Sequence, residues 1–297
     1  MKHYVLCQHG LLGNAADFQR LADHFNSRND HPVRVIILEK SSGLTQTLDG
    51  VKEGGSRCLN EILSLIWSET ITRGSRISFV GHSLGGLYLR FALREIESHY
   101  TKIWDDFSIK RTACIFLATP HAGIDCSSWI VRDSVKHLFR HFSSTARDLN
   151  LTSNVLAQIS DVKGLDSLNH FKSVVLYGNA QCDNLVSLSS SLILTSDSVP
   201  LVDTPTTDTV VITELTSHET TTHDSSGARS DIIECLNNGL KHVRKFAVWF
   251  PPKLPNSLRF MDNTAHHRIV CHGILDRGKE GLPVVHHLEA VLEQLDK

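Results

Sequence analysis

The sequence predicts an α/β fold in which helices cover both faces of a mostly parallel sheet. Two observations lead to this fold class. Short apolar runs are near-continuous rather than alternating, which is typical of parallel strands buried on both faces. Longer segments with apolar residues every three or four positions separate these runs, and such alternation produces a doubly wound sheet. We therefore expect one α/β domain over residues 1–297.

Each predicted strand is a short apolar run bounded by polar or turn-forming residues. The first five runs are 4–8, 33–39, 77–80, 112–118 and 173–177. Later in the chain, three more strands are predicted at 210–215, 246–250 and 258–261. The segments with helical spacing of apolar residues predict helices at 14–25, 53–71, 84–100 and 282–295.

Two segments interrupt the alternation of strand and helix. Residues 127–168 have helical periodicity but no strand, directly after the fourth predicted strand, and we predict a helical cap insertion there. Residues 184–230 are rich in Ser, Thr and Asp, which predicts a mobile excursion around one or two short strands. Neither segment marks a clean domain boundary, so both are interpreted as insertions in the single domain.

Composition argues against several functional classes. The chain has 30 Lys+Arg against 32 Asp+Glu and no basic block, so no nucleic-acid partner is expected. Seven scattered cysteines without a C-x-x-C pair argue against a disulfide framework and for a reducing compartment. The sequence also shows no signal peptide and no long uncharged apolar run. We expect a cytoplasmic protein, and transient membrane-surface contact through the predicted cap is a hypothesis.

The stretch Gly81-His82-Ser83-Leu84-Gly85 matches G-x-S-x-G, the pattern of a nucleophile elbow. In such a turn the serine lies between a strand and a helix, and glycines flank it because neighbouring backbone passes too close for a Cβ. The apolar run before the serine and the amphipathic run after it provide this context. Ser83 is therefore predicted to be a nucleophile rather than a bystander in a glycine-rich turn.

A serine that attacks a carbonyl also needs two backbone N–H groups to stabilise the oxyanion. One is expected from Leu84, the residue after the nucleophile, at the start of a helix. The second is expected from Leu11 in HGLLG, a loop after the first predicted strand in which Gly10 permits a tight turn. Leu11 and Leu84 are thus the predicted oxyanion hole.

At this point the chain resembles a known family. The motifs HGLLGNAADF, FVGHSLGGLYLRFA and FLATPHAG, in that order, are similar to those of the serine esterase/lipase family of eukaryotic lipase-like proteins. This family belongs to the α/β-hydrolase superfamily. The resemblance covers residues 3–125 and is weaker over 171–188 and 258–272. It implies an α/β-hydrolase fold without the family's first two strands, so that the first strand here corresponds to the third.

The acid of a triad is expected in a loop after a strand that follows the nucleophile, because the chain order in this fold is Ser, Asp/Glu, His. Asp183 lies in GNAQCDN, after the strand predicted at 173–177, and YGNAQCDNLV matches the family's pattern. Asp125, after LATPHAG, is the alternative. The remaining candidates lie in the Ser/Thr-rich segment, too far from a strand end to be held rigidly: Asp197, Asp203 and Asp208.

The base is expected after the last predicted strand. His266 fits the family's A-H-x-x-I pattern, while its neighbour His267 and then His272 remain open alternatives. His218 and His223 form H-E-x-x-x-H, one residue longer than the zinc-binding H-E-x-x-H, in a segment that is a poor helix. No metal site is therefore predicted, and no organic cofactor is expected.

These residues predict a serine esterase or lipase that cleaves an acyl ester through an acyl-serine intermediate. His266 would take the Ser83 proton, Asp183 would orient His266, and water would release the acyl group. The apolar residues near the oxyanion hole and the family's association with lipases favour a lipid ester as substrate.

Leu12 and His121 are the predicted substrate-binding residues. For His121, structural support of its loop is the alternative, and it applies equally to His9 and His82. Two further functional classes remain open at this point. An acyltransferase on the same fold would differ only in using an alcohol rather than water, and a non-catalytic interaction protein would keep the fold without the chemistry.

Overall fold

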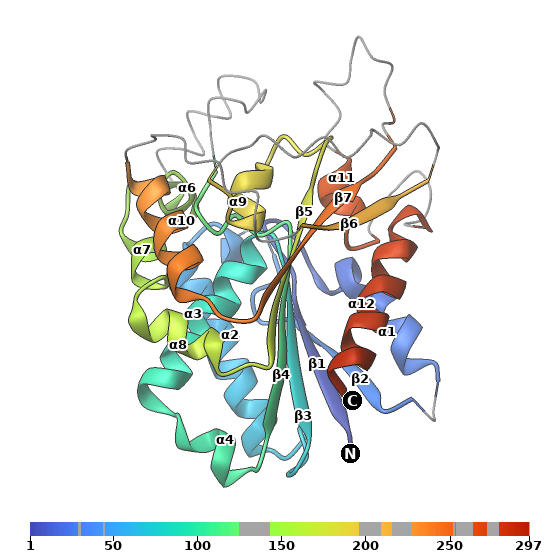
Figure 1. Ribbon diagram of the computed structural model, residues 1–297. Helices are drawn as coiled ribbons and strands as arrows, with labels where there is room; N and C mark the ends of the chain where they lie inside the picture. The colour runs from blue at the N-terminus through green and yellow to red at the C-terminus, as the bar shows by residue number, and fades with distance from the viewer. Residues whose placement is uncertain are drawn as a thin grey trace.

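A seven-stranded sheet forms the centre of the computed structural model (Figure 1). The strand order is β2-β1-β3-β4-β5-β7-β6, and all neighbours are parallel except β6, which pairs antiparallel with β7. The strands are β1 His3–Gln8, β2 Val33–Leu38, β3 Arg76–His82, β4 Lys110–Leu117, β5 Ser173–Asn179, β6 Val211–Leu215 and β7 Val243–Trp249. The predicted doubly wound, mostly parallel sheet is confirmed.

The structure describes residues 1–28, 31–43, 45–124, 143–195, 209–215, 227–251, 253, 264–271 and 279–296. The longer helices are α1 Gln19–Asn26, α2 Val51–Trp67, α3 Leu84–His99, α8 Val162–Asn169, α10 Ala228–Gly239 and α12 Leu282–Asp296. The shorter ones are α4 Lys102–Asp106, α6 Ser144–Leu149, α7 Val155–Gln158, α9 Leu188–Leu192 and α11 Ala265–Arg268. Within these ranges, no helix has both the length and the apolarity needed to cross a membrane.

Helices cover both faces of the sheet and enclose two hydrophobic cores. The α2, α3 and α8 helices lie on one face, and α1 and α12 lie on the other (Figure 1). The core under α3 contains Phe79 and Phe116 from the strands, while Val5 and Val80 point to the opposite core. Successive residues of each strand therefore face different cores, which explains the near-continuous apolar runs.

Most predicted elements are confirmed, with shifts at their ends. The helix predicted over 14–25 is split into a 3₁₀ turn, Ala15–Phe18, and α1. The split follows from Asn14, whose side chain accepts a hydrogen bond from the Ala16 N–H and closes a tight first turn. The strand predicted at 246–250 begins earlier, as β7, and the one predicted at 258–261 lies outside the described residues.

The described part of the predicted cap consists of α6, α7 and α8. Helix α8 packs against α3 and leads into β5, so it belongs to the layer that covers the sheet. Side chains of α6 accept hydrogen bonds from backbone N–H groups at the start of α2. Asp148 accepts from the Val51 N–H at 2.7 Å, and Thr145 accepts from the Gly50 N–H at 3.0 Å. Residues 127–142 lie outside the described part, and a cap there stays a prediction.

The first part of the Ser/Thr-rich segment differs from the predicted mobile excursion. Helix α9 is buried, and Ser190 is fully enclosed. The Ser190 hydroxyl donates to the Gly123 carbonyl at 2.6 Å and accepts from the Ala122 N–H at 3.1 Å. Ser190 thus satisfies backbone groups of the loop after β4, a pairing between distant segments that composition does not reveal.

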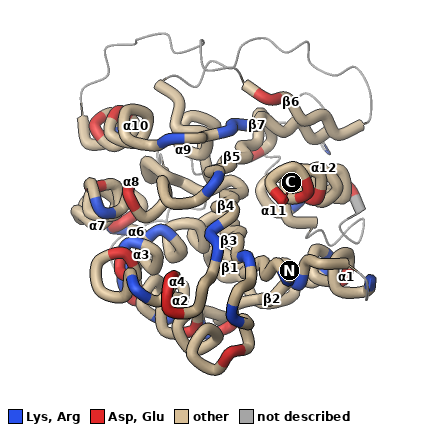
Figure 2. The backbone as a smooth tube through the Cα atoms, turned by 60° about the horizontal axis from the view of Figure 1, so that its bottom comes forward, with Lys and Arg blue, Asp and Glu red and all other residues tan. Residues whose placement is uncertain are grey.

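Basic residues lie at the amino ends of several strands, at one end of the sheet (Figure 2). Arg76 begins β3 and Lys110 begins β4, so these side chains gather in space although the sequence contains no basic block. Arg76 pairs with Asp296 of α12 at 3.0 Å, which partly neutralises the positive charge of this group of basic residues. These basic residues lie at the amino end of the sheet, opposite the loops that follow the carboxyl ends of the strands.

Candidate active site

Ser83 lies at the sharp turn between β3 and α3, at the carboxyl end of the sheet. Its backbone has φ 52° and ψ −128°, a strained left-handed conformation for a residue with a side chain. Gly85 is required by close packing, since an added Cβ would lie 2.3 Å from the carbonyl oxygens of Gln8 and His9. An added Cβ at Gly81 would lie 2.5 Å from the Cα atom of Gly86. The turn has the geometry of a nucleophile elbow.

Ser83, His266 and Asp183 form one hydrogen-bonded chain. The Ser83 Oγ lies 2.9 Å from Nε2 of His266, and Nδ1 of His266 lies 2.9 Å from Oδ2 of Asp183. All three side chains are buried. They come from the elbow, from α11 and from the loop after β5, which meet because the carboxyl ends of parallel strands share one edge of the sheet.

Asp183 is held as a carboxylate by four hydrogen-bond donors. Oδ1 accepts from the backbone N–H groups of Leu185 and Val186, each at 3.0 Å. Oδ2 accepts from the Asn179 amide at 2.7 Å and from His266. Burial by itself would raise the pKa of Asp183, but His266 and the other donors outweigh it and lower that pKa below its usual value.

Of the two adjacent histidines, the structure brings only His266 into hydrogen-bonding contact with Ser83 and Asp183 within the described part of the chain. The His267 side chain is exposed, and the ring centroids of the pair lie 5.6 Å apart. The alternative acids and the alternative base at position 272 lie outside the described residues, as do His218 and His223.

The loop HGLLG lies directly against the elbow. An added Cβ at Gly10 would lie 2.8 Å from the Ser83 Cβ and 3.4 Å from the Leu84 backbone nitrogen. The Leu11 and Leu84 N–H groups donate no hydrogen bond to the residues that the structure describes, whereas the Leu12 N–H binds the Thr47 hydroxyl at 3.1 Å. Two unpaired donors beside a nucleophile match the requirement of an oxyanion hole.

Comparison with known proteins agrees with this geometry. Residues 1–197 match the model of the family described as "Putative serine esterase (DUF676)". The chain belongs to this serine esterase family. It is 31% identical over 207 residues to "Putative lipase ROG1" and 29% identical over 205 residues to "Putative lipase YDL109C", both of Saccharomyces cerevisiae. Each match covers 66% of this chain but only 29% and 31% of the relatives, so the chain spans less than a third of their length.

A solved structure supports the fold of this esterase-family chain. Carboxyl esterase 2 (TmelEST2) from the mycorrhizal fungus Tuber melanosporum matches it with a TM-score of 0.55 at 8% sequence identity. The match covers 99% of this chain and 76% of that one. Together with the sheet order, it confirms the α/β-hydrolase fold implied by the three sequence motifs.

Replacing Gly10 with alanine tests the predicted oxyanion hole of this family member. The new Cβ would overlap the backbone around Ser83 and push the Leu11 N–H out of place. Loss of one oxyanion donor lowers kcat by about 100- to 1,000-fold, so we expect Gly10→Ala to lower kcat on a short-chain ester by that factor. Gly74→Ala is the control: an added Cβ there meets nothing within 4 Å, although the φ of 71° strains an alanine, so this variant should lose stability and keep kcat. Equal kcat in both variants would contradict the assignment.

His121 is buried, and its role in substrate binding stays a prediction. Arg90 of α3 donates from Nη1 to the His121 carbonyl and to Nδ1, both at 3.3 Å, and the ring packs edge-on against Phe116. Burial and the neighbouring Arg90 lower the pKa of His121 well below its usual value, so the ring is neutral. We propose that His121 supports the loop after β4.

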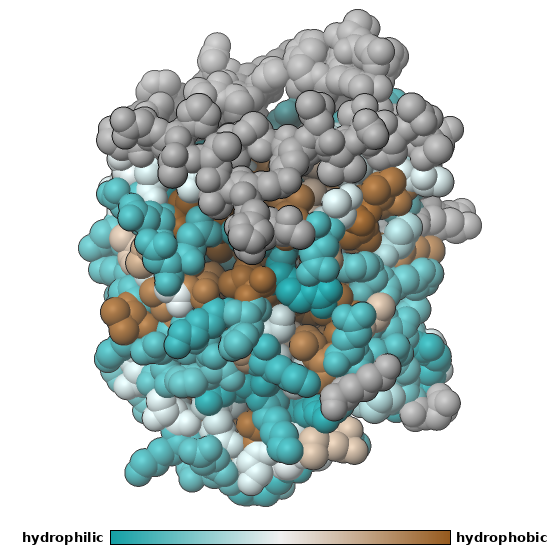
Figure 3. Space-filling view, in the orientation of Figure 1, coloured by the Kyte–Doolittle hydropathy of each residue, from teal (hydrophilic) through white to brown (hydrophobic). Residues whose placement is uncertain are grey.

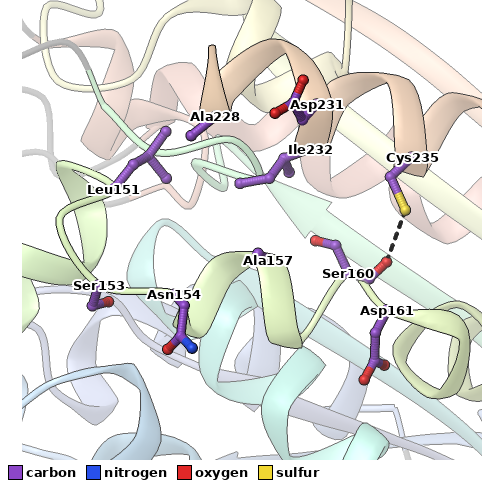
Figure 4. Close-up of a pocket in the computed structure, with 10 residues that line it drawn as sticks. All are labelled: Leu151, Ser153, Asn154, Ala157, Ser160, Asp161, Ala228, Asp231, Ile232 and Cys235. Carbon is purple, nitrogen blue, oxygen red and sulfur yellow. Dashed lines mark hydrogen bonds between the residues drawn. The ribbon is translucent and has the colours of Figure 1, made fainter.

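A cavity of about 340 Å³ lies away from the triad, between the α7 region and α10 (Figure 4). Leu151, Ala157 and Ile232 provide its apolar walls. Cys235 of α10 also lines the cavity, and its thiol donates to the Ser160 carbonyl at 3.1 Å. Ser83, His266 and Asp183 are not among the residues that line this cavity.

One group of metal-ligating side chains lies within the described residues, on the α12 side. Donor atoms of His31, Glu289 and Glu293 lie within 4.8 Å of one another. Glu289 already binds Arg28 and also accepts from His24 at 2.8 Å. These ion pairs account for the cluster as a link between α1 and α12.

Sequence reasoning missed the residues that support the acid. Asn179 ends β5 and donates to Asp183, and the N–H groups of Leu185 and Val186 close the loop around it. The only signal was the asparagine in the family's Y-[AG]-N pattern, because loop amides cannot be paired with a carboxylate from sequence alone.

Proposed function

We propose that the chain is a serine hydrolase that cleaves acyl esters through a covalent acyl-serine intermediate. The proposal is carried by one observation, the chain of two 2.9 Å hydrogen bonds that joins Ser83, His266 and Asp183. Serine is a weak nucleophile at its free pKa, and a histidine oriented by a carboxylate is the arrangement that activates it.

In the first half-reaction, the Ser83 oxygen attacks the ester carbonyl carbon and its proton passes to Nε2 of His266. The carbonyl oxygen becomes an oxyanion, which the Leu11 and Leu84 N–H groups stabilise. His266 then gives the proton to the leaving alcohol, and the acyl group stays on Ser83. Asp183 holds Nδ1 of His266 throughout and stabilises the imidazolium that forms.

In the second half-reaction, water replaces the alcohol. His266 accepts a proton from the water as it attacks the acyl carbon, and the oxyanion forms again in the same place. Collapse of this intermediate breaks the bond to Ser83, which recovers its proton from His266. Every proton transfer passes through His266, so at the end of the second half-reaction Ser83 and His266 have returned to their initial protonation states.

A lipid ester is the proposed substrate. Leu12 is 57% exposed in the loop that carries the Leu11 N–H, so an apolar side chain faces solvent beside the proposed oxyanion hole. Hydrophobic surface also gathers beside the grey region in Figure 3. An acyl chain suits such surfaces, and the names of the yeast relatives support the same substrate class.

A fluorophosphonate probe tests the nucleophile directly, because it reacts only with an activated serine. We expect covalent labelling of the wild-type chain and none of Ser83→Ala. Ser167→Ala is the matched control, since this buried serine donates only to the Gly164 carbonyl of its own helix, and this variant should label normally. Labelling that persists in Ser83→Ala would contradict the proposal, and an unlabelled wild type would favour a non-catalytic protein.

A further inference from the structure

Two hydrogen bonds tie the main chain of the proposed base to the other segments of the site. The Cys182 carbonyl, in the acid loop, accepts from the Ala265 N–H at 3.1 Å. The His82 ring, next to the nucleophile, donates from Nε2 to the His266 carbonyl at 2.8 Å. The first bond holds the peptide that precedes Ala265, and the second holds the peptide that follows His266, so the main chain is held on both sides of the base along the sequence.

The second bond depends on one tautomer of His82. A carbonyl oxygen only accepts, so Nε2 of His82 must carry the proton. The other ring nitrogen, Nδ1, is buried and has no hydrogen-bond partner among the described residues. Burial lowers the pKa of His82 well below its usual value, and the nearby His266 and His267 lower it further. His82 is therefore a neutral donor at neutral pH.

A neutral ring at this position also suits the chemistry of its neighbour. The ring centroids of His82 and His266 lie 4.9 Å apart. His266 gains a positive charge each time it accepts a proton, and a second positive charge at this distance would oppose that step. His82 thus binds the base without competing for its proton.

The base needs this support because its own element is short. Helix α11 has four residues, and no side chain caps its first turn. The bond between Ser83 and His266 is also temporary, since the serine oxygen is esterified in the acyl-enzyme and can no longer donate a proton. At that stage only Asp183 holds the ring, while His266 must remain aligned with the attacking water.

We propose that His82 is a positioning residue that holds the main chain of His266 in place throughout the reaction. The proposal rests on the function proposed above, and His82 itself touches neither substrate nor reacting atoms. Its contribution is to keep the base within reach of Ser83 and of water when the direct bond between the two triad residues is absent.

Two substitutions separate the hydrogen bond from the volume of the ring. His82→Leu removes the donor and keeps an apolar group of similar size, whereas His82→Gln keeps an N–H donor at a similar reach. We expect kcat on a short-chain p-nitrophenyl ester to fall about 10- to 100-fold in His82→Leu, with KM changed less than about twofold. In His82→Gln, kcat should recover to within about threefold of wild type.

His3→Leu is the matched control for general destabilisation. His3 is also a buried histidine on a strand, and it binds Ser78 and Asp296 at the amino end of the sheet, away from the triad. We expect His3→Leu to lower the melting temperature and keep kcat. A kcat that is unchanged in His82→Leu, or that falls as far in His82→Gln, would overturn the proposal.

A second measurement does not depend on turnover. The proton between Nδ1 of His266 and Asp183 should give a low-field NMR signal, which we expect in wild type and in His82→Gln. In His82→Leu the signal should broaden or disappear because the base is no longer held. An unchanged signal in His82→Leu would overturn the positioning role. Absence of esterase activity in the wild type would instead overturn the proposed function, and the NMR signal would still decide the role of His82.

Discussion

His266→Ala should lower kcat on a short-chain ester by about 10⁴- to 10⁶-fold, whereas His267→Ala should stay within about threefold of wild type. The two residues are neighbours, but only His266 bonds to both Ser83 and Asp183 within the described part of the chain. Without an acceptor for its proton, Ser83 reverts to an ordinary alcohol. Steady-state kinetics of the two purified variants, with melting temperatures measured alongside, checks the result.

The adjacent pair makes this comparison its own control. Both substitutions change a histidine of α11 to alanine, so general effects on the helix are matched. The His267 side chain is exposed, and its removal opens no cavity. If the His267 variant lost activity and the His266 variant kept it, the base would be assigned to the wrong residue.

Asp183→Asn should lower kcat by about 10⁴-fold with little change in KM. The asparagine oxygen can still accept from the Leu185 and Val186 N–H groups, so the loop should keep its shape. Its NH₂ group would face Nδ1 of His266 and favour the tautomer with the proton on Nε2, which cannot accept the proton of Ser83. Kinetics on the same ester, with unfolding measured in parallel, tests the expectation.

Asp161→Asn is the matched control for this change. Asp161 is the N-cap residue of α8, where an asparagine can also accept from the Gly164 N–H, and it pairs with Arg94 at 2.6 Å rather than with Ser83, His266 or Asp183. We expect it to keep wild-type kcat. A loss of similar size in both variants would show that the effect of Asp183→Asn is on folding rather than on the base.

The lowered pKa of Asp183 adds a signature in the pH dependence of stability. A carboxyl whose pKa is lower in the folded chain stabilises the fold above the unfolded value of about 3.9. This contribution is lost as pH falls through the lowered pKa of the folded state. Urea unfolding of wild type between pH 7 and pH 3 should therefore show an acid-dependent loss that is smaller in Asp183→Asn.

A second Ser–His–Asp arrangement in this chain illustrates that hydrogen bonds among these three residue types are not sufficient for a catalytic site. Ser78 Oγ lies 2.8 Å from Nε2 of His3, whose Nδ1 lies 3.1 Å from Asp296. Ser78 is a fully buried strand residue, and its oxygen already accepts from the Ala113 N–H at 3.1 Å. Ser78 lies inside β3 rather than at a turn between a strand and a helix, and its bond to His3 joins the sheet to Asp296 of α12.

Much of the fold could be predicted from the sequence because its signals are local. Near-continuous apolar runs predicted the parallel strands, and G-x-S-x-G between a strand and a helix predicted the elbow at Ser83. Helix ends were less accurate where a side chain acts locally, as Asn14 does before the first 3₁₀ turn. The buried α9 was missed because its Ser190 binds the backbone of a loop that lies far away in the chain.

The sequence by itself determined the fold class, the nucleophile candidate and the loop beside it, because each depends on residues that are close together in the chain. Only the tertiary structure decided which histidine reaches Ser83, how Asn179 and two backbone amides support Asp183, and that His82 binds the base. Those contacts join residues separated by up to 184 positions. Distances across the sheet, rather than spacing along the chain, set the hydrogen bonds on which the proposed chemistry depends.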